Sequence, residues 1–376
     1  MNFSISREQL INSLNDVMKA ISNKVTIPIL TGIKLELTER GLLLTGSDSD
    51  ITIQRFIPTE HNGTVYIESE KEGSIVIPAR YLNEIVKKMP KDVVTITASE
   101  QHQIEIVSGA AQFDLIGFDA NDYPILPNLE NEQPFSMMAN VLKSIVKETV
   151  FAVSQQETRP TLTGVHFEMK EDELYAVATD SHRLARRITT LEKLPEQPFN
   201  AVIPGRSLQE LSKILEDDEE IDIIIADQQV LFKTENMSFY SRLLEGTYPE
   251  TSRLIPKEYE TTVQLNGKSF LQAIDRASLL ARERRNNIVH FETMDDQTIK
   301  ITSTSPEVGE VEELIAAEMI TGAPVNLAFS ATYMMEALKA IDDEMIAIQF
   351  TGPMRPFILH PVDSQAVLQL ILPVRT

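Results

Sequence analysis

The spacing of apolar positions predicts a unit of helices and strands that occurs three times along the chain. Apolar residues three and four apart predict amphipathic helices over 9–24, 141–154 and 269–285. A second set of helices is predicted over 78–91, 204–215 and 331–341, and Pro78, Pro204 and Ser330 suit their first turns or caps. Alternating β-branched residues after the second helices, for example 93–96 and 221–225, predict strands.

Short stretches of the amino-acid sequence also repeat, at spacings close to one third of the chain length. Val165-His166-Phe167-Glu168 recurs as Val289-His290-Phe291-Glu292, 124 residues later, and residues 161–168 resemble residues 29–36 at a spacing of 132. Tyr-Pro pairs at 123–124 and 248–249 close the first two copies. We therefore expect an α+β protein of three repeated domains, 1–127, 128–254 and 255–376, with polar linkers at 128–134 and 256–261.

Composition narrows the classes of function that remain. The 376 residues contain no Cys, which excludes disulfides, a thiol nucleophile, Cys-ligated zinc and iron–sulfur clusters. The first residues lack the basic and apolar regions of a secretory signal, and no apolar run approaches the roughly 18 residues that span a bilayer. We expect a cytoplasmic protein.

Motifs for catalysis or cofactor binding are incomplete. Asp180-Ser181-His182 has the side-chain types of a hydrolytic triad, but consecutive residues of a strand point to opposite faces, so Ser181 would face away from the other two. Gly267-Lys268-Ser269 resembles the end of a phosphate-binding loop, whose first Gly is replaced by Thr262. The acidic run 216–220 lacks the spacing of a calcium loop. We expect no catalytic residue, cofactor or metal.

Positive charge is concentrated in the predicted helices. The formal net charge of the chain is −22. The six predicted helices together carry +8, so the remaining residues carry −30. This segregation is typical of a protein whose helices face a polyanion. Weak contacts to phosphate suffice for a protein that encloses DNA, since no base is read. The candidate phosphate contacts are Lys19, Lys24, Arg80, Lys87, Lys88, Lys91, Lys143, Lys147, Arg206, Lys213, Arg276, Arg282, Arg284 and Arg285.

Four segments, together with the triple repeat, resemble the bacterial β sliding clamp family over all 376 residues. They are Thr179-Asp180-Ser181-His182-Arg183-Leu184-Ala185, Arg159-Pro160-Thr161-Leu162-Thr163-Gly164, Glu245-Gly246-Thr247-Tyr248-Pro249 and Leu372-Pro373-Val374-Arg375. The family supplies processivity to DNA polymerase III, a DNA-directed DNA polymerase, and has no catalytic activity of its own. The resemblance implies the DNA-clamp fold, in which two three-domain protomers join head to tail as a six-domain ring around duplex DNA.

The resemblance also implies three sets of functional residues. Positions matching Lys24 and Gln156 would contact DNA. Phe113 and Leu115, on an edge strand, would meet Leu279 and Leu280 of the second protomer. A pocket between domains 2 and 3 would dock a Leu- and Phe-rich linear motif of the polymerase, the clamp loader and repair proteins. Its walls would be Leu162, Thr179, Ser181, His182, Arg183, Leu184, Pro249, Leu254, Leu372, Pro373, Val374 and Arg375.

Two other functions stay open at this point. One is a hydrolase that uses Asp180 and His182. The other is a scaffold of repeated domains that binds proteins independently of any polyanion. The charge confined to the helices favours the DNA-encircling clamp over the scaffold, and the incomplete motifs count against the hydrolase.

Overall fold

The computed structural model describes residues 1–22, 26–126, 129, 133–195, 198–281 and 287–375. The chain divides into two compact units. Unit 1 comprises Met1–Ala139 and Lys213–Leu243, and unit 2 comprises Asn140–Ser212 and Leu244–Thr376. The middle third of the chain therefore contributes to both units.

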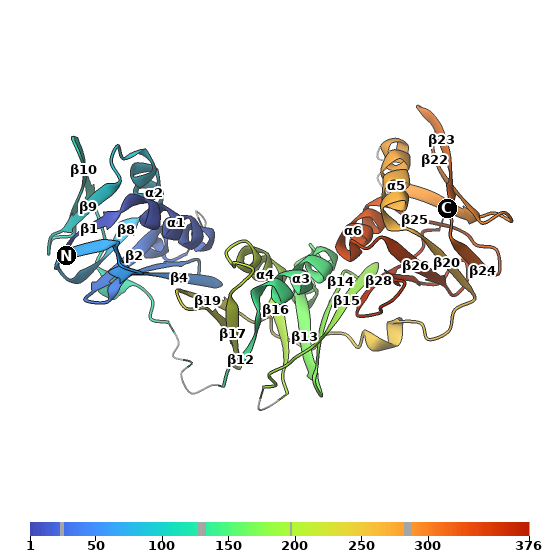
Figure 1. Cartoon of the computed structure of the whole chain (residues 1–376), viewed down its shortest axis with the longest axis horizontal. Helices are drawn as coiled ribbons and strands as arrows, with labels where there is room; N and C mark the ends of the chain where they lie inside the picture. Colours follow the sequence, from blue (N-terminus) through green and yellow to red (C-terminus); the bar gives the residue numbers. More distant parts are fainter. Residues whose placement is uncertain (23–25, 127–128, 130–132, 196–197, 282–286, 376) are drawn as a thin grey trace. The chain divides into compact units, whose positions relative to one another are not determined.

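Unit 1 contains two large antiparallel sheets and two α-helices (Figure 1). One sheet has the strand order β11-β10-β9-β1-β7 and the other has the order β12-β17-β18-β19-β4-β3-β2-β8. The elements are β1 (Asn2–Ser6), α1 (Arg7–Val17), β2 (Gly32–Thr38), β3 (Gly41–Ser47), β4 (Ile51–Pro58), β5 (Glu60–His61), β6 (Thr64–Val65), β7 (Ile67–Lys71), β8 (Gly73–Pro78), α2 (Ala79–Lys88), β9 (Val93–Ala98), β10 (Gln103–Ser108), β11 (Ala111–Ile116), β12 (Phe135–Met138), β17 (Glu220–Ile225), β18 (Gln229–Lys233) and β19 (Met237–Arg242), with short 3₁₀ helices η1 (Met18–Ala20), η2 (Pro28–Thr31) and η3 (Ala120–Asp122).

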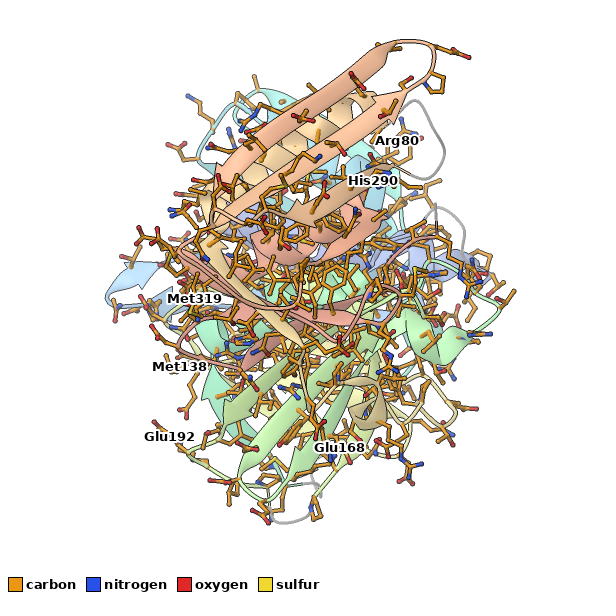
Figure 2. All side chains as sticks on the ribbon, turned by 90° about the vertical axis from the view of Figure 1, so that its right-hand side faces the viewer. Arg80, Met138, Glu168, Glu192, His290 and Met319 are labelled. Carbon is orange, nitrogen blue, oxygen red and sulfur yellow. The ribbon has the colours of Figure 1, made fainter. Side chains whose placement is uncertain are left out.

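Unit 2 contains a nine-stranded and a four-stranded sheet, ordered β16-β13-β14-β15-β28-β27-β26-β20-β24 and β23-β22-β21-β25. The β22–β23 hairpin, in orange, lies at the top of Figure 2, which also labels His290 of β21. The elements are α3 (Ala139–Thr149), β13 (Gly164–Lys170), β14 (Glu173–Thr179), β15 (Arg183–Thr190), β16 (Asn200–Pro204), α4 (Gly205–Ser212), β20 (Thr261–Asn266), α5 (Gly267–Ala281), β21 (Ile288–Thr293), β22 (Thr298–Ser305), β23 (Gly309–Ala316), β24 (Met319–Gly322), β25 (Asn326–Ser330), α6 (Ala331–Ile341), β26 (Met345–Phe350), β27 (Phe357–Pro361) and β28 (Val367–Ile371), with 3₁₀ helices η4 (Val150–Ala152), η5 (Pro160–Thr163) and η6 (Ser252–Leu254).

Each helix forms where its apolar stripe can be buried. In α1, Leu10, Leu14 and Val17 lie on one face and are fully buried, and the helix packs on β3, β4 and α2. The last turn of α2 carries Lys87 and Lys88, which interact favourably with the carbonyl end of the helix. In α6 the Ser330 side chain accepts a hydrogen bond from the N–H of Tyr333.

The sheets bury alternate residues against these helices, as half-buried strands require. Residues of β1 alternate between half-buried and buried, and residues of β9 do the same after an exposed first position. In unit 2 the core contains a cluster of aromatic rings, among which Phe350 and Phe357 have centroids 5.3 Å apart. These cores hold the strand ends and turns that carry the candidate sites.

The structure confirms the α+β class and all six predicted helices. Where the predicted range is fully described, α2, α3 and α4 are shorter than predicted and α6 matches its range. The predicted repeat of helix, strands, helix, strands is also present. The interpretation of Asp180-Ser181-His182 as part of a strand is wrong. These residues form the turn between β14 and β15, because side-chain hydrogen bonds to the backbone replace the ladder there.

Candidate protein-docking pocket and nucleic-acid interface

The turn between β14 and β15 is held by two of its own side chains. Asp180 Oδ1 accepts hydrogen bonds from the backbone N–H groups of His182 (2.9 Å) and Arg183 (3.1 Å). Thr179 Oγ1 accepts another from the N–H of Ser181 (3.2 Å), which has a positive φ of 78°. The turn leaves the side chains of Ser181 and His182 exposed. In the described part of the chain, no hydrogen bond joins the His182 ring to Asp180 or Ser181, so the triad geometry is not formed.

Arg183 is bound within the chain on every side. Its guanidinium lies over the rings of Phe151 and Tyr333, at 5.2 and 4.4 Å from their centroids. Its Nε donates to Asp180 Oδ2 (3.0 Å), while Nη1 pairs with Glu336 and Nη2 donates to the carbonyl of Phe151. The side chain is only 10% exposed. Of its five N–H groups, at most two remain for a ligand.

The C-terminal segment runs beside this turn. Strand β28 pairs with β15, and the next residue, Leu372, donates its N–H to the carbonyl of His182 (3.0 Å). Val374 donates its N–H to the carbonyl of Ala328 (2.7 Å). Leu372, Pro373 and Val374 are half-buried. Val374 and Arg375 line a cavity of about 450 Å³ that also involves His290, Asn326, Leu327, Ala328, Pro353 and Met354.

Leu162 and Tyr248 form the buried base of the same region. Leu162 packs against Val202 and Tyr248. The Tyr248 hydroxyl accepts a hydrogen bond from the N–H of Thr179 (3.1 Å), and its ring stacks on His166 with centroids 4.8 Å apart. Burial raises the pKa of Tyr248, which keeps the hydroxyl protonated. One side chain thus ties the base to the turn.

The structure therefore brings together most of the residues predicted for the pocket. Thr179, Leu184 and Leu162 are buried next to the turn, and Leu372 is hydrogen-bonded to it. Leu184 packs in a cluster with Leu368 and Leu370, apart from Leu162. Pro249 follows Tyr248 and is exposed, and Leu254, on η6, is 51% exposed. Phe151, Tyr333 and Glu336 were not predicted to belong to the site. Tyr248 was noted only as part of the repeated Tyr-Pro pair and of the segment 245–249, and that repeat was a signal for its structural role.

The predicted phosphate contacts differ in their surroundings. Lys87, Lys88 and Lys91, here called the α2-end lysines, are exposed and have no acidic partner within 4 Å among the described residues. Other helical cations are paired: Arg80 with Glu84, Lys147 with Asp342, Arg276 with Glu313, and Lys19 with Asp16. Gln156, Arg206 and Lys213 are exposed, and Lys143 is half-buried. Lys24, Arg282, Arg284 and Arg285 lie outside the described residues.

Apolar side chains are exposed on a sheet edge in unit 1 and near the end of a helix in unit 2. In unit 1, β11 is an edge strand, as predicted, and Phe113 on it is 42% exposed while Leu115 is half-buried. In unit 2, Leu279 near the end of α5 is 62% exposed and Leu280 is half-buried. Helix α5 packs on β22 and on β23, and β23 is one of the two edge strands of the four-stranded sheet.

Three models of one family match nearly the whole chain. The models for the N-terminal, central and C-terminal domains of the DNA polymerase III beta subunit match residues 1–127, 136–250 and 252–375. The chain belongs to the DNA polymerase III beta-subunit family.

Relatives in this family match along their full length. The beta sliding clamp of Bacillus subtilis is 49% identical over 377 residues, covering all of both chains, and that of Staphylococcus aureus is 47% identical with the same coverage. The crystal structure of the Bacillus subtilis clamp superposes with a TM-score of 0.98, covering 100% of this chain and 99% of that one. The clamp of Pseudomonas aeruginosa, 26% identical, still gives 0.92 with full coverage of both chains.

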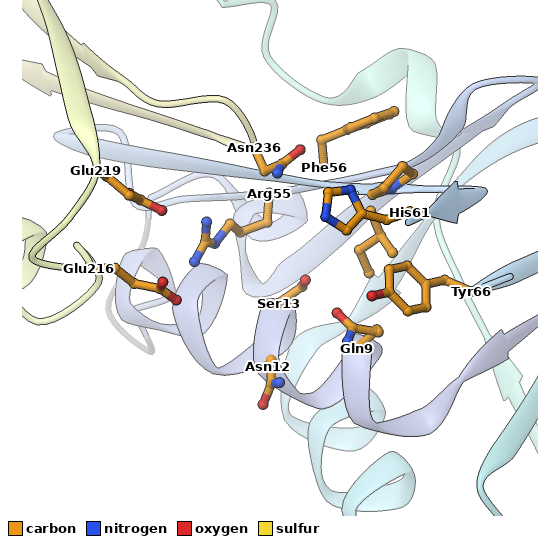
Figure 3. Close-up of a pocket in the computed structure, with 12 residues that line it drawn as sticks. Gln9, Asn12, Ser13, Arg55, Phe56, His61, Tyr66, Glu216, Glu219 and Asn236 are labelled. Carbon is orange, nitrogen blue, oxygen red and sulfur yellow. The ribbon is translucent and has the colours of Figure 1, made fainter. Parts of the chain in front are cut away.

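This member of the beta-subunit family also has a polar cavity of about 300 Å³ in unit 1 (Figure 3). Arg55 reaches into it and pairs with Asp16 of α1 at 2.7 Å. Burial raises the pKa of Glu219, and Arg55 opposes that shift. Figure 3 shows His61 and Tyr66 at the other end of the cavity. Within the described residues no three His, Asp or Glu side chains are grouped to hold a metal ion, and no helix is long and apolar enough to cross a membrane.

Proposed function

We propose that this protein is a sliding clamp that encircles duplex DNA and tethers the replicative DNA polymerase. The observation that carries the proposal is the full-length match to beta sliding clamps. The repeated fold and the exposed α2-end lysines support it, since weak contacts to phosphate hold DNA without reading sequence. The protein acts as an accessory subunit and not as a catalyst, and we place it in the cytoplasm.

Ring closure would use the two exposed sheet edges. Strands β11 and β23 both have an unpaired edge within the described part of their sheets, and such edges pair readily with another strand. Phe113 and Leu115 of one protomer would then meet Leu279 and Leu280 of the other. The contact joins two different surfaces, so two copies close into a ring only if the rotation fits. A head-to-tail dimer of three-domain protomers, with domains 1–127, 128–254 and 255–376, meets that requirement.

Partner proteins would dock at the pocket of unit 2. Leu162, Leu184 and Leu372 offer apolar walls for Leu or Phe side chains of a linear motif. His182 and Arg375 are exposed beside them and could orient the peptide backbone, whereas Arg183 holds the wall in place through Glu336 and Phe151. The polymerase, the clamp loader and repair proteins would compete for this pocket.

The test of the proposed function is topological. The protein is loaded onto nicked circular plasmid by a cognate clamp loader with ATP, washed in moderate salt, and the DNA is then cut. Retention on circles and release on cutting is the expected result. Release from circles by salt, with an active loader, would point to ordinary electrostatic binding and would contradict the proposal.

A further inference from the structure

The turn between β3 and β4 in unit 1 repeats the turn of the unit 2 pocket. Asp48 Oδ1 accepts hydrogen bonds from the N–H groups of Asp50 (3.1 Å) and Ile51 (2.9 Å), as Asp180 does in unit 2. Ser47 Oγ accepts from the N–H of Ser49 (3.2 Å), whose φ of 81° matches the 78° of its counterpart. The two turns therefore have the same hydrogen-bonded frame.

The neighbouring strand is repeated as well. Strand β19 pairs with β4 in the way that β28 pairs with β15. The N–H of Arg242 donates to the carbonyl of Asp50 at 3.0 Å, and the N–H of Leu372 donates to the carbonyl of His182 at the same distance. Arg242 therefore occupies in unit 1 the position that Leu372 occupies in unit 2.

The buried base completes the correspondence. Leu30 packs with Val76 and Tyr123, as Leu162 packs with Val202 and Tyr248. Each leucine lies on a 3₁₀ helix that begins with Pro and ends with Thr. Burial raises the pKa of Tyr123, as it does for the tyrosine of unit 2.

This frame encloses a cavity of about 180 Å³, here called the unit 1 pocket. Leu30, Tyr123 and Pro124 line it, and so do Ile27 and Ile125, which are 43% and 97% exposed. A cavity of about 150 Å³ can hold a benzene ring. The unit 1 pocket therefore has room for one Leu or Phe side chain.

The lining differs from that of unit 2 in its polarity. Thr52 stands in the place of Leu184, and Arg242 in the place of Leu372. The Arg242 guanidinium is exposed and has no hydrogen bond or ion pair among the described residues. A carboxylate next to the apolar anchor would complement it, because charged pairs of this kind form short, bidentate hydrogen bonds.

We propose that the unit 1 pocket is a second docking site for a linear peptide, one that carries a Leu or Phe side chain directly beside an Asp or Glu. The inference rests on the proposed function of the unit 2 pocket, whose frame it shares. The two sites would select different partners, since one is walled by leucines and the other combines an apolar base with the Arg242 guanidinium and the Asp50 carboxylate at its edge.

The chain contains no Cys, so a single introduced Cys can be labelled cleanly. Ile125→Cys and Leu254→Cys, each carrying an environment-sensitive fluorophore, report on the unit 1 and unit 2 pockets. The probes are acetyl-Asp-Leu-Phe-amide, its Asn-Leu-Phe analogue, and a longer Leu- and Phe-rich peptide. We expect the Ile125 reporter to titrate with the Asp peptide and at least tenfold more weakly with the Asn analogue.

Two charge reversals complete the test on the Ile125 reporter. Arg242→Glu should weaken binding of the Asp peptide at least tenfold. Arg40→Glu, the same charge change at the opposite end of β3, should leave it within twofold; circular dichroism checks that both variants fold. A silent Ile125 reporter, or equal effects of the two reversals, overturns the second site. A silent Leu254 reporter with the longer peptide counts against the unit 2 pocket instead.

Discussion

The proposed ring interface makes a quantitative prediction for Phe113. A Phe side chain buries about 150–250 Å², and this one is 42% exposed in the protomer. Covering the exposed part removes about 85 Å² from water, which at about 25 cal/mol per Å² stabilises one interface by about 2 kcal/mol. A two-protomer ring has two such interfaces. Phe113→Ala should therefore weaken the dimer by about 4 kcal/mol, or about 1,000-fold in its dissociation constant.

The control is on the same strand. Ile116 is 78% exposed but lies on the opposite face of β11, because successive residues of a strand alternate. Phe113 pairs with Ile106, which is buried, so it lies on the face that the helices cover. Ile116→Ala removes a similar amount of apolar surface and should leave the dissociation constant within about fivefold.

Sedimentation velocity over a dilution series measures both constants. Reversal of the order, with the Ile116 variant dissociating more readily, would mean that the outer face of β11 forms the contact. A change below tenfold for Phe113→Ala would refute the assignment of this residue to the interface. Loss of plasmid retention should accompany dissociation, since an open or monomeric clamp cannot stay linked to a circle.

Three further predictions concern the α2-end lysines, Tyr248 and Glu148. Reversing the charge of the α2-end lysines should slow loading onto DNA and lower the salt exponent of loading by up to about 0.9 per lost phosphate contact, while clamps already loaded stay on circles. Tyr248→Phe leaves the N–H of Thr179 without its acceptor, which costs about 1–3 kcal/mol. Backbone hydrogen exchange in residues 174–190 should therefore become about 5- to 150-fold faster. The control is Tyr240→Phe, which should leave the exchange rates unchanged because the Tyr240 hydroxyl has no hydrogen-bond partner among the described residues. Glu148 is half-buried and its carboxylate lies 3.2 Å from Arg187. Burial raises the pKa of Glu148 although Arg187 opposes the shift. Its contribution to stability is therefore present below the unfolded pKa and lost as the pH rises through the folded pKa, and chemical denaturation should show the wild type losing stability relative to Glu148→Gln across that rise.

The periodicity of the sequence was sufficient to predict the repeat and the helices. Helical stripes such as Leu10, Leu14 and Val17 depend on local spacing, which the sequence displays directly. The ends of helices were less predictable, since they depend on capping and on packing with distant strands.

The turn at Asp180 shows why the strand predicted for residues 180–182 is not formed. Alternation predicts a strand through this position, but a short acidic side chain that bonds the backbone two and three residues ahead stops the ladder. The role of Arg183 could not be predicted from the sequence either. Its partners Phe151 and Glu336 come from distant parts of the chain, and only the folded structure places them around one guanidinium.

The sharing of strands between repeats limits how far one repeat can be separated from the next. Strands β17–β19 belong by sequence to the second repeat, yet they lie in one sheet with β2, β3, β4 and β8 of the first. The repeated segment is therefore different from the compact segment. A first repeat cut out at its boundaries would lose half of that sheet and leave the edge of β4 that β19 covers without a partner strand. Such an edge pairs readily with another chain, so an isolated first repeat should associate with copies of itself.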